Sequence, residues 1–241
     1  MKNVVITGLG IKSCIGNNYS DVLNNLSKGN SGIVFNDTYS EMGFRSCVSG
    51  SIDINLAEQI DRKLYRFMGE SAGYAYLATK DALDMAGIDE KDLDSPNIGI
   101  VAGSGGASTR VMLESGDIAR EKGPKRIGPY GVTKSMSSSI SAIIATALKL
   151  KGINYSISSA CATSAHCIGH AADLIRNGQQ NIVIAGGSDD EHWSSSCLFD
   201  AMGALSSNFN ATPTIASRPY DSDRDGFVIS GGSGMIVLEE E

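Results

Sequence analysis

Short apolar segments alternate along the chain with longer segments in which apolar residues recur every three or four positions. The short segments are rich in β-branched residues and bounded by glycine, which is typical of buried strands. They are residues 4–7, 98–102, 155–158, 182–185 and 235–238. The longer segments predict helices, at residues 19–27, 63–86, 132–149, 162–176 and 195–202, with Gly87 and Gly178 ending two of them. Because strands and helices alternate with short connections, we predict an α/β fold with a largely parallel sheet covered by helices.

Two polar stretches rich in glycine and serine interrupt this order, at about residues 29–61 and 104–129. We interpret both as surface insertions, and we expect no domain boundary and no short repeat. The chain ends in three glutamates directly after an apolar segment. That ending fits a chain cut from a longer protein, and it also fits an exposed acidic terminus.

Composition narrows the class of protein. A chain of 241 residues with 41% hydrophobic and 20% charged residues is typical of soluble globular proteins. The net charge of -7 argues against a nucleic-acid partner, since phosphate binding needs clustered basic residues. The first residues lack the pattern of a secretory signal, and no stretch approaches the ~20 apolar residues of a membrane span.

The cysteines indicate a reducing compartment. The sequence holds five of them, with neither a CxxC pair nor the spacing of a disulfide framework: Cys14, Cys47, Cys161, Cys167 and Cys197. We therefore expect free thiols and a cytoplasmic protein.

The strongest chemical signal is the run SSACATSAH at residues 158–166, where a predicted strand gives way to a predicted helix. Cys161 would lie at the amino end of that helix. Unpaired N–H groups and the helix dipole there favour the thiolate, which is the nucleophilic form, and the same N–H groups could stabilise an oxyanion. A small packing residue is the commoner role for a cysteine, and spacing alone leaves both interpretations open.

Residues 154–169, NYSISSACATSAHCIG, resemble the active-site segment of the β-ketoacyl carrier-protein synthases, which belong to the thiolase superfamily. Other segments resemble the same family in the same order along essentially the whole chain. They are residues 5–10 with 15–17, 61–63 with 66–68, 102–106, 128–130 with 133–134, 199–205, and 221 with 224–228.

The resemblance implies one half of a layered αβαβα thiolase-like fold, so that residues 1–241 form an amino-terminal half. In this family the cysteine, here Cys161, takes an acyl group from an acyl carrier protein. Malonyl carrier protein is then decarboxylated and condenses with the acyl group, and no cofactor or metal is required. The family's catalytic histidines, lysine and glycine-rich phenylalanine loop lie in the second half. The histidines present here, His166, His170 and His192, have no such context. We therefore expect the chain to be catalytically incomplete in condensation.

The resemblance also implies further site residues. Phe199 is the candidate for lining the acyl tunnel, with Gly105, Met136 and Met202 as weaker candidates, although ordinary core packing is the alternative for each. Basic residues that the family uses to dock the acidic carrier protein correspond to Arg62, Lys63 and Arg66, with Lys125 and Arg126 as additions. A solvated helix face is the alternative for this charge cluster. The family forms homodimers through the strand before the cysteine, here residues 155–159.

Other patterns carry less. His166 lies five residues after Cys161, about 140° around the helix, so we interpret it as a structural, hydrogen-bonded residue. Asp221, Asp223 and Asp225 open like a calcium loop, but Gly232 stands where a bidentate carboxylate is needed, and we interpret Asp225 as a loop-ordering residue. The pair of His166 and His170 has too little support for a metal site.

The glycine runs lack the residues of a nucleotide loop. Two alternative functions stay open: another acyltransferase of the superfamily, such as a thiolase or polyketide ketosynthase, and a non-catalytic partner subunit that provides dimerisation.

Overall fold

The computed structural model describes residues 2–106 and 108–241. Its tertiary contacts divide the chain into two compact units. The first comprises Met1–Lys12, Asn55–Asp189 and Ser233–Glu241, and the second comprises Ser13–Ile54 and Asp190–Gly232. The sequence led us to expect no boundary. Each unit is assembled from segments that are distant in sequence, so no linker marks the division.

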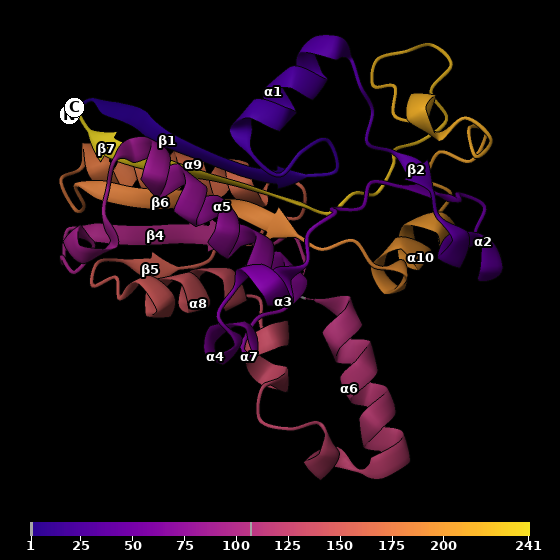
Figure 1. Ribbon diagram of the computed structural model, residues 1–241, viewed down its shortest axis with the longest axis horizontal. Helices are drawn as coiled ribbons and strands as arrows, with labels where there is room; N and C mark the ends of the chain where they lie inside the picture. Colours follow the sequence, from indigo (N-terminus) through magenta and orange to yellow (C-terminus); the bar gives the residue numbers. More distant parts are fainter. Residues whose placement is uncertain (1, 107) are drawn as a thin grey trace. The chain divides into compact units, whose positions relative to one another are not determined.

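The first unit is built on a five-stranded sheet with the strand order β1-β7-β6-β4-β5 (Figure 1). The strands are β1 (Val4–Ser13), β4 (Ile98–Gly103), β5 (Asn154–Tyr155), β6 (Ile182–Asp189) and β7 (Gly232–Glu240). β4 pairs in parallel with β5 on one side and with β6 on the other. All the predicted strands are present, but β5 is only two residues long.

Helices cover both faces of this sheet. The helices α5 (Glu70–Ala86) and α8 (Ser139–Leu148) share one apolar cluster with Ile98, Ile100 and Ile184 of the sheet. The helix α9 (Thr163–Arg176) shares a second cluster with Val101 and Val183. Neighbouring residues of one strand therefore face opposite clusters, which is the period of two expected of a strand buried on both sides. The predicted α/β architecture is confirmed.

Two predicted helices are each divided in two. The first consists of α4 (Arg62–Tyr65) and α5, because Gly69 caps α5 in an extended conformation. A Cβ atom at Gly69 would lie 3.0 Å from the carbonyl oxygen of Lys134, a tight contact that favours glycine at this position. The second consists of α7 (Gly131–Ser135) and α8, with Met136 extended between them. The serines at 137–139 favour such a break, since their side chains compete with helical hydrogen bonds.

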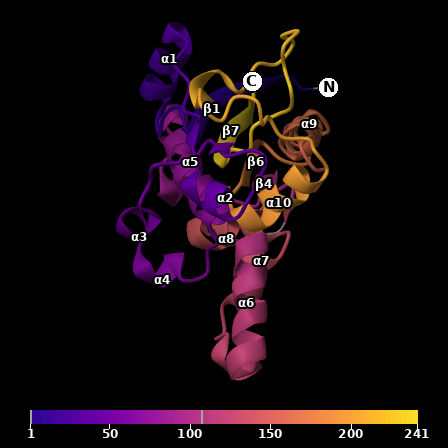
Figure 2. The ribbon, with the colours of Figure 1, turned by 90° about the vertical axis from the view of Figure 1, so that its right-hand side faces the viewer.

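The stretch at 104–129 forms the helix α6 (Thr109–Lys122) and the 3₁₀ helix η2 (Pro124–Arg126). Figures 1 and 2 show α6 extending away from the sheet, and none of its residues is buried. Its base is tied to the first turn of α5 by an ion pair of 2.6 Å between Arg110 and Glu70. No residue of α6 or η2 is buried, whereas Ser104 and Ser108 at the start of the stretch are buried, and the interpretation of residues 104–129 as a surface insertion stays a prediction. Two short helices, α3 (Leu56–Gln59) and η1 (Glu90–Asp92), complete the first unit.

The second unit has a small core of its own. Its elements are α1 (Tyr19–Lys28), β2 (Val34–Phe35), α2 (Asp37–Glu41), β3 (Val48–Ser49), α10 (Trp193–Ala201) and η3 (Pro213–Ile215), and β2 pairs antiparallel with β3. Ile33, Val48 and Ala216 form a buried cluster, and Tyr39 is only 1% exposed. Of the stretch interpreted as a surface insertion, residues 29–61, part lies in this core and part is exposed, as Val34, Phe35 and Met42 are, while residues 55–61 belong to the first unit.

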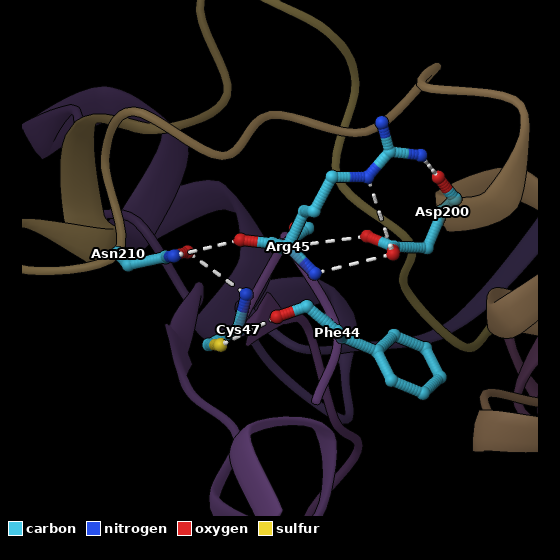
Figure 3. A network of polar contacts seen from close by, with 6 residues as sticks. Phe44, Arg45, Cys47, Asp200 and Asn210 are labelled. Carbon is cyan, nitrogen blue, oxygen red and sulfur yellow. Dashed lines mark hydrogen bonds and ion pairs between the residues drawn. The ribbon is translucent and has the colours of Figure 1, made fainter. Parts of the chain in front are cut away.

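Polar side chains hold the two segments of this second unit together (Figure 3). The Asp200 carboxylate accepts hydrogen bonds from the backbone N–H groups of Arg45, at 3.1 Å, and Ser46, at 2.9 Å. Asn210 accepts from the Cys47 N–H at 2.8 Å and donates to the Arg45 carbonyl at 2.9 Å. These bonds fix the chain before β3 to α10 and to the chain that follows it.

Asp225 orders a loop of the second unit, as predicted. Its Oδ2 atom accepts hydrogen bonds from the N–H groups of Ser207, at 2.8 Å, and Asn208, at 2.7 Å. Burial opposes ionisation of this carboxyl group, but the donors around it, among them these two amides, outweigh burial and lower its pKa.

Among residues 2–106 and 108–241, no helix is long and apolar enough to cross a membrane.

Candidate active site

The segment that leads to Cys161 runs along β4 to the carboxyl edge of the sheet. Because β4, β5 and β6 are parallel, their carboxyl ends lie at one edge, where ligands commonly bind in open α/β sheets. Beyond β5, the Ser156 hydroxyl donates to the Ala102 carbonyl at 2.5 Å, and the Ser158 hydroxyl donates to the Ser104 carbonyl at 3.0 Å. Serine hydroxyls thus continue the pairing where the regular ladder stops.

A tight turn then carries Cys161 into α9. Ala160 has φ +49°, in the left-handed region that residues with a Cβ atom rarely adopt. The Ala162 N–H donates to the Ser159 carbonyl at 3.1 Å, and the Thr163 N–H donates to the Ala160 carbonyl at 3.1 Å. The buried Thr163 hydroxyl also accepts from the Ser159 N–H at 2.8 Å. Thr163 therefore binds the turn through both its backbone and its side chain.

Cys161 is exposed and lies just before the amino end of α9, a helix of 14 residues. The helix begins at Thr163 with Ala162 as its N-cap, one residue later than the prediction, and no side chain caps it. Its first N–H groups point toward the end where Cys161 lies, which is an arrangement suited to a thiolate or a developing oxyanion. By contrast, Cys167, four residues after the first residue of α9, is fully buried, and burial raises the pKa of its thiol.

Of the four predicted tunnel residues, Gly105 lies beside this turn. A Cβ atom there would be 3.0 Å from the Ala160 carbonyl oxygen. Met136 is half-buried at the end of α7 in the first unit. Phe199 and Met202 belong to the second unit, where both are exposed, and the Phe199 ring meets the Phe227 ring edge-on at 5.5 Å.

The predicted docking residues fall on two separate elements of the first unit. Arg62 and Lys63 are exposed on α4, and Lys125 and Arg126 are exposed on η2. In the part of the chain that the structure describes, none of these four side chains forms an ion pair. Arg66 differs, because its guanidinium lies over the rings of Phe67, at 5.0 Å, and Tyr130, at 5.5 Å. It joins the end of α4 to the start of α7.

The edge of the sheet at β5 carries a histidine and a tyrosine in contact. The Tyr155 hydroxyl forms a hydrogen bond with Nε2 of His170 on α9. Burial, and then the nearby Cys167, raise the pKa of Tyr155. His166 is exposed on the same helix, and no hydrogen bond of its side chain is found among the described residues, which does not support the structural role predicted for it.

Sequence reasoning missed residues that contact this turn or the loop beside it. Thr163 is predicted only as part of a motif, and the predicted site residues include neither Ser104, whose carbonyl accepts from Ser158, nor Asp189, whose Oδ1 atom accepts from the Ser104 hydroxyl at 2.6 Å and the Gly105 N–H at 2.9 Å. A signal was available for each: Ser104 directly follows a buried strand and precedes two glycines, and Asp189 ends a strand that is parallel to it.

Comparison with known proteins identifies the family. The family model described as "Beta-ketoacyl synthase, N-terminal domain" matches residues 1–241. The chain belongs to this family. It is 51% identical over its full length to 3-oxoacyl-[acyl-carrier-protein] synthase 1 of Haemophilus influenzae and to the same enzyme of Escherichia coli, of which it covers 59% and 60%.

Solved structures of the family agree in fold. A beta-ketoacyl synthase from Burkholderia phymatum superposes with a TM-score of 0.91 at 26% identity, covering 100% of this chain and 60% of that one. A ketosynthase of a type II polyketide synthase, solved in complex with its acyl carrier protein, superposes with a TM-score of 0.85 at 28% identity, covering 99% of this chain and 58% of that one. The thiolase-like α/β fold is thereby confirmed. The chain spans about 60% of the length of the curated relatives it matches.

Proposed function

We propose that this chain is the amino-terminal part of a 3-oxoacyl-[acyl-carrier-protein] synthase of fatty acid elongation, and that Cys161 is its acyl-accepting nucleophile. One observation carries the proposal: the single cysteine that is exposed stands at the amino end of α9, on a turn fixed by hydrogen bonds on both sides. The chain's 51% identity with synthases of this type supports the same activity.

The acylation step uses groups that the chain possesses. The Cys161 thiolate attacks the carbonyl carbon of the acyl thioester, and a tetrahedral oxyanion forms. The C–S bond to the carrier's thiol then breaks, that sulfur leaves with the electron pair and takes up a proton, and the acyl group remains on Cys161 as a new thioester. The candidate stabilisers of the oxyanion are N–H groups near the start of α9 other than those of Ala162 and Thr163, which are bonded within the turn.

Condensation needs more than these residues. Decarboxylation of malonyl carrier protein requires donors that stabilise the enolate, and the family resemblance assigns them to the part of the relatives that this chain does not span. We therefore propose that the chain as given is acylated but does not form 3-oxoacyl product.

We further propose an acidic acyl carrier protein as the partner, docked through Arg62, Lys63, Arg66, Lys125 and Arg126. The exposure of most of these cations on an otherwise acidic protein supports docking that is steered by charge and sensitive to salt. A homodimer through the β5 edge is part of the same proposal, since β5 ends the sheet and Tyr155 is 37% exposed. Five free thiols support a cytoplasmic location.

The test is acylation by an acyl carrier protein bearing a labelled acyl group, read by mass spectrometry of the peptide that contains residue 161. We expect the label on Cys161, none in Cys161→Ala, and undiminished labelling in Cys197→Ala, a matched control at a half-buried thiol. No label on Cys161, or equal labelling of Cys14, would reject the proposal. Charge reversal at Lys63 and Arg66 should weaken binding of the acyl carrier protein. An unchanged affinity for the carrier would reject the proposed docking surface.

A polyketide ketosynthase is the second candidate, because one of the similar structures, at 28% identity, is a ketosynthase of a type II polyketide synthase. It would use the same cysteine with a different acyl donor. Comparing the acylation rates from fatty-acyl carrier protein, polyketide carrier protein and acyl coenzyme A distinguishes these functions. A non-catalytic partner subunit is disfavoured by the retained, exposed Cys161.

A further inference from the structure

A carboxylate at the carboxyl end of β6 ties down the glycine-rich loop that follows β4. Oδ1 of Asp189 lies 2.6 Å from the Ser104 hydroxyl and 2.9 Å from the Gly105 N–H. The Gly106 N–H donates to the same hydroxyl at 3.2 Å, which leaves the hydroxyl proton for an acceptor. The Gly106 carbonyl is also within reach of that proton, but a charged acceptor forms the stronger bond. One carboxylate oxygen therefore orders residues 104–106.

Asp189 reaches this loop because of the register of the sheet. β4 and β6 are parallel neighbours, with Gly103 opposite Gly187. Two residues further on, the side chain at 189 lies opposite the start of the loop. β6 is itself held close to the first turn of α9, since a Cβ atom on Gly187 would lie 2.9 Å from the Cβ atom of Ser164.

The loop is packed in turn against the residues that carry Cys161. Gly105 approaches Ala160 so closely that a Cβ atom would be 3.0 Å from the Ala160 carbonyl oxygen, and the Ser104 carbonyl accepts from the Ser158 hydroxyl at 3.0 Å. Ala160 stands in the left-handed region, which such a residue holds only where its surroundings enforce it. Loop and turn are thus one packed assembly.

From these contacts we infer that Asp189 is a positioning residue for Cys161. It holds residues 104–106 in place, and these residues pack against the turn at residues 159–163 that carries Cys161, called here the nucleophile turn. The inference rests on the proposed function of Cys161. Asp189 itself touches no reacting atom in this role. Its side chain fixes the loop, the loop fixes Ala160, and Ala160 fixes the place of Cys161 relative to the amino end of α9.

A positioning role of Asp189 and a simple effect of its negative charge predict opposite changes in the alkylation rate of Cys161. If only the negative charge of Asp189 mattered, removing it would favour the thiolate, and alkylation of Cys161 would become faster at neutral pH. If Asp189 positions the turn, removing its hydrogen bonds lets Cys161 leave the helix end, and the thiolate loses the stabilisation that the helix supplies. Alkylation would then become slower.

The experiment measures the rate of alkylation of Cys161 by iodoacetamide between pH 6 and pH 10, with Cys14 and Cys197 as internal references in the same peptide map. The variants are Asp189→Ala, Asp189→Asn and Ser104→Ala. Asp173→Asn is the matched control, because Asp173 is an exposed carboxylate of α9 that pairs with Arg176 at 3.0 Å.

We expect Asp189→Ala to slow alkylation at neutral pH by about two- to fivefold, the size of a charge interaction at a helix end, and to move the midpoint of the pH profile upward. Asp189→Asn keeps an acceptor oxygen and should show a smaller change, Ser104→Ala should act in the same direction, and Asp173→Asn should leave the profile unchanged. If Asp189 contributed only to stability, the midpoint of the pH profile of Cys161 alkylation would not change, because a larger unfolded fraction does not alter the surroundings of the thiol in the folded protein.

An unchanged or faster rate in Asp189→Ala, with the wild-type Cys161 reacting faster than Cys14 and Cys197, overturns this inference and leaves the proposed function intact. A wild-type Cys161 that reacts no faster than those two overturns both. Should Asp189→Ala fail to fold, the Asp189→Asn and Ser104→Ala profiles decide in its place by the same direction of change.

Discussion

Replacing Thr163 by valine tests whether the nucleophile turn depends on one side-chain acceptor. Thr163 is 3% exposed, and its hydroxyl accepts from the Ser159 N–H at 2.8 Å. Valine has nearly the same shape as threonine but no hydroxyl. The variant therefore leaves the Ser159 N–H without this acceptor in a partly buried place and changes little else.

The expected cost follows from that single lost acceptor. A buried donor left without a partner costs about 1–3 kcal/mol, more than the ~1 kcal/mol that an average hydrogen bond contributes. The methyl group of Thr163 packs near Gly103, where a Cβ atom would lie 3.0 Å from it, and valine keeps a methyl there. Packing therefore does not add to the cost, and we expect Thr163→Val to lower the free energy of unfolding by about 2 kcal/mol.

Thr163→Ser is the matched control, because serine keeps the acceptor and loses the methyl group. It should cost about 1 kcal/mol through lost packing, while leaving the turn in place. Unfolding in urea, followed by circular dichroism, gives both free energies, and the alkylation rate of Cys161 in the folded proteins reports on the turn. We expect alkylation to slow in the valine variant and to stay near the wild-type rate in the serine variant.

A loss of less than about 0.5 kcal/mol in Thr163→Val, the usual range of a substitution with no buried partner, would contradict a role for the Thr163 hydroxyl. A larger loss in Thr163→Ser than in Thr163→Val would contradict it equally. Either result would mean that the turn is held by its backbone hydrogen bonds and not by the Thr163 side chain.

Three further predictions concern stability in urea. Gly10→Ala would put a Cβ atom 1.7 Å from the Ala78 carbonyl oxygen and should lower the free energy of unfolding by about 3 kcal/mol or more. Gly169→Ala, in α9, would add a Cβ atom with no neighbour within 4 Å and should raise the free energy of unfolding by about 0.5–1 kcal/mol. Equal effects of the two substitutions would contradict the packing of β1 on α5. Asp225→Asn should destabilise at neutral pH. The pKa of Asp225 is lowered in the folded state, so its contribution is complete above the unfolded value of about 3.9 and is lost as pH falls through the folded value; a difference between variant and wild type that persists in acid would exclude this cause. Ile184→Ala, at a fully buried position of β6, should cost about 2–5 kcal/mol, and a cost below ~1 kcal/mol would mean that this position is not in the core.

Sequence patterns over a few residues predicted the order of strands and helices. They also predicted the place of Cys161 between a strand and a helix. Apolar periodicity distinguishes strand from helix over a few residues, and glycines such as Gly87, which has φ +69° after α5, mark helix ends. Local patterns did not predict features that depend on contacts with distant segments of the chain. The break between α7 and α8 and the extended Gly69 depend on one segment lying close to another, which no window of sequence records.

The α/β class, the family resemblance and the candidate nucleophile could be read from the amino-acid sequence, since these depend on residue types in a fixed order. The division into two units, the burial of Tyr39 and Val48 in an apparently polar stretch, and the hydrogen bonds from Asp189 to the loop beside Ala160 became visible only in the folded chain. The physical reason is that a hydrogen bond or a buried contact between residues 85 positions apart, as between Ser104 and Asp189, depends on the path of the whole chain.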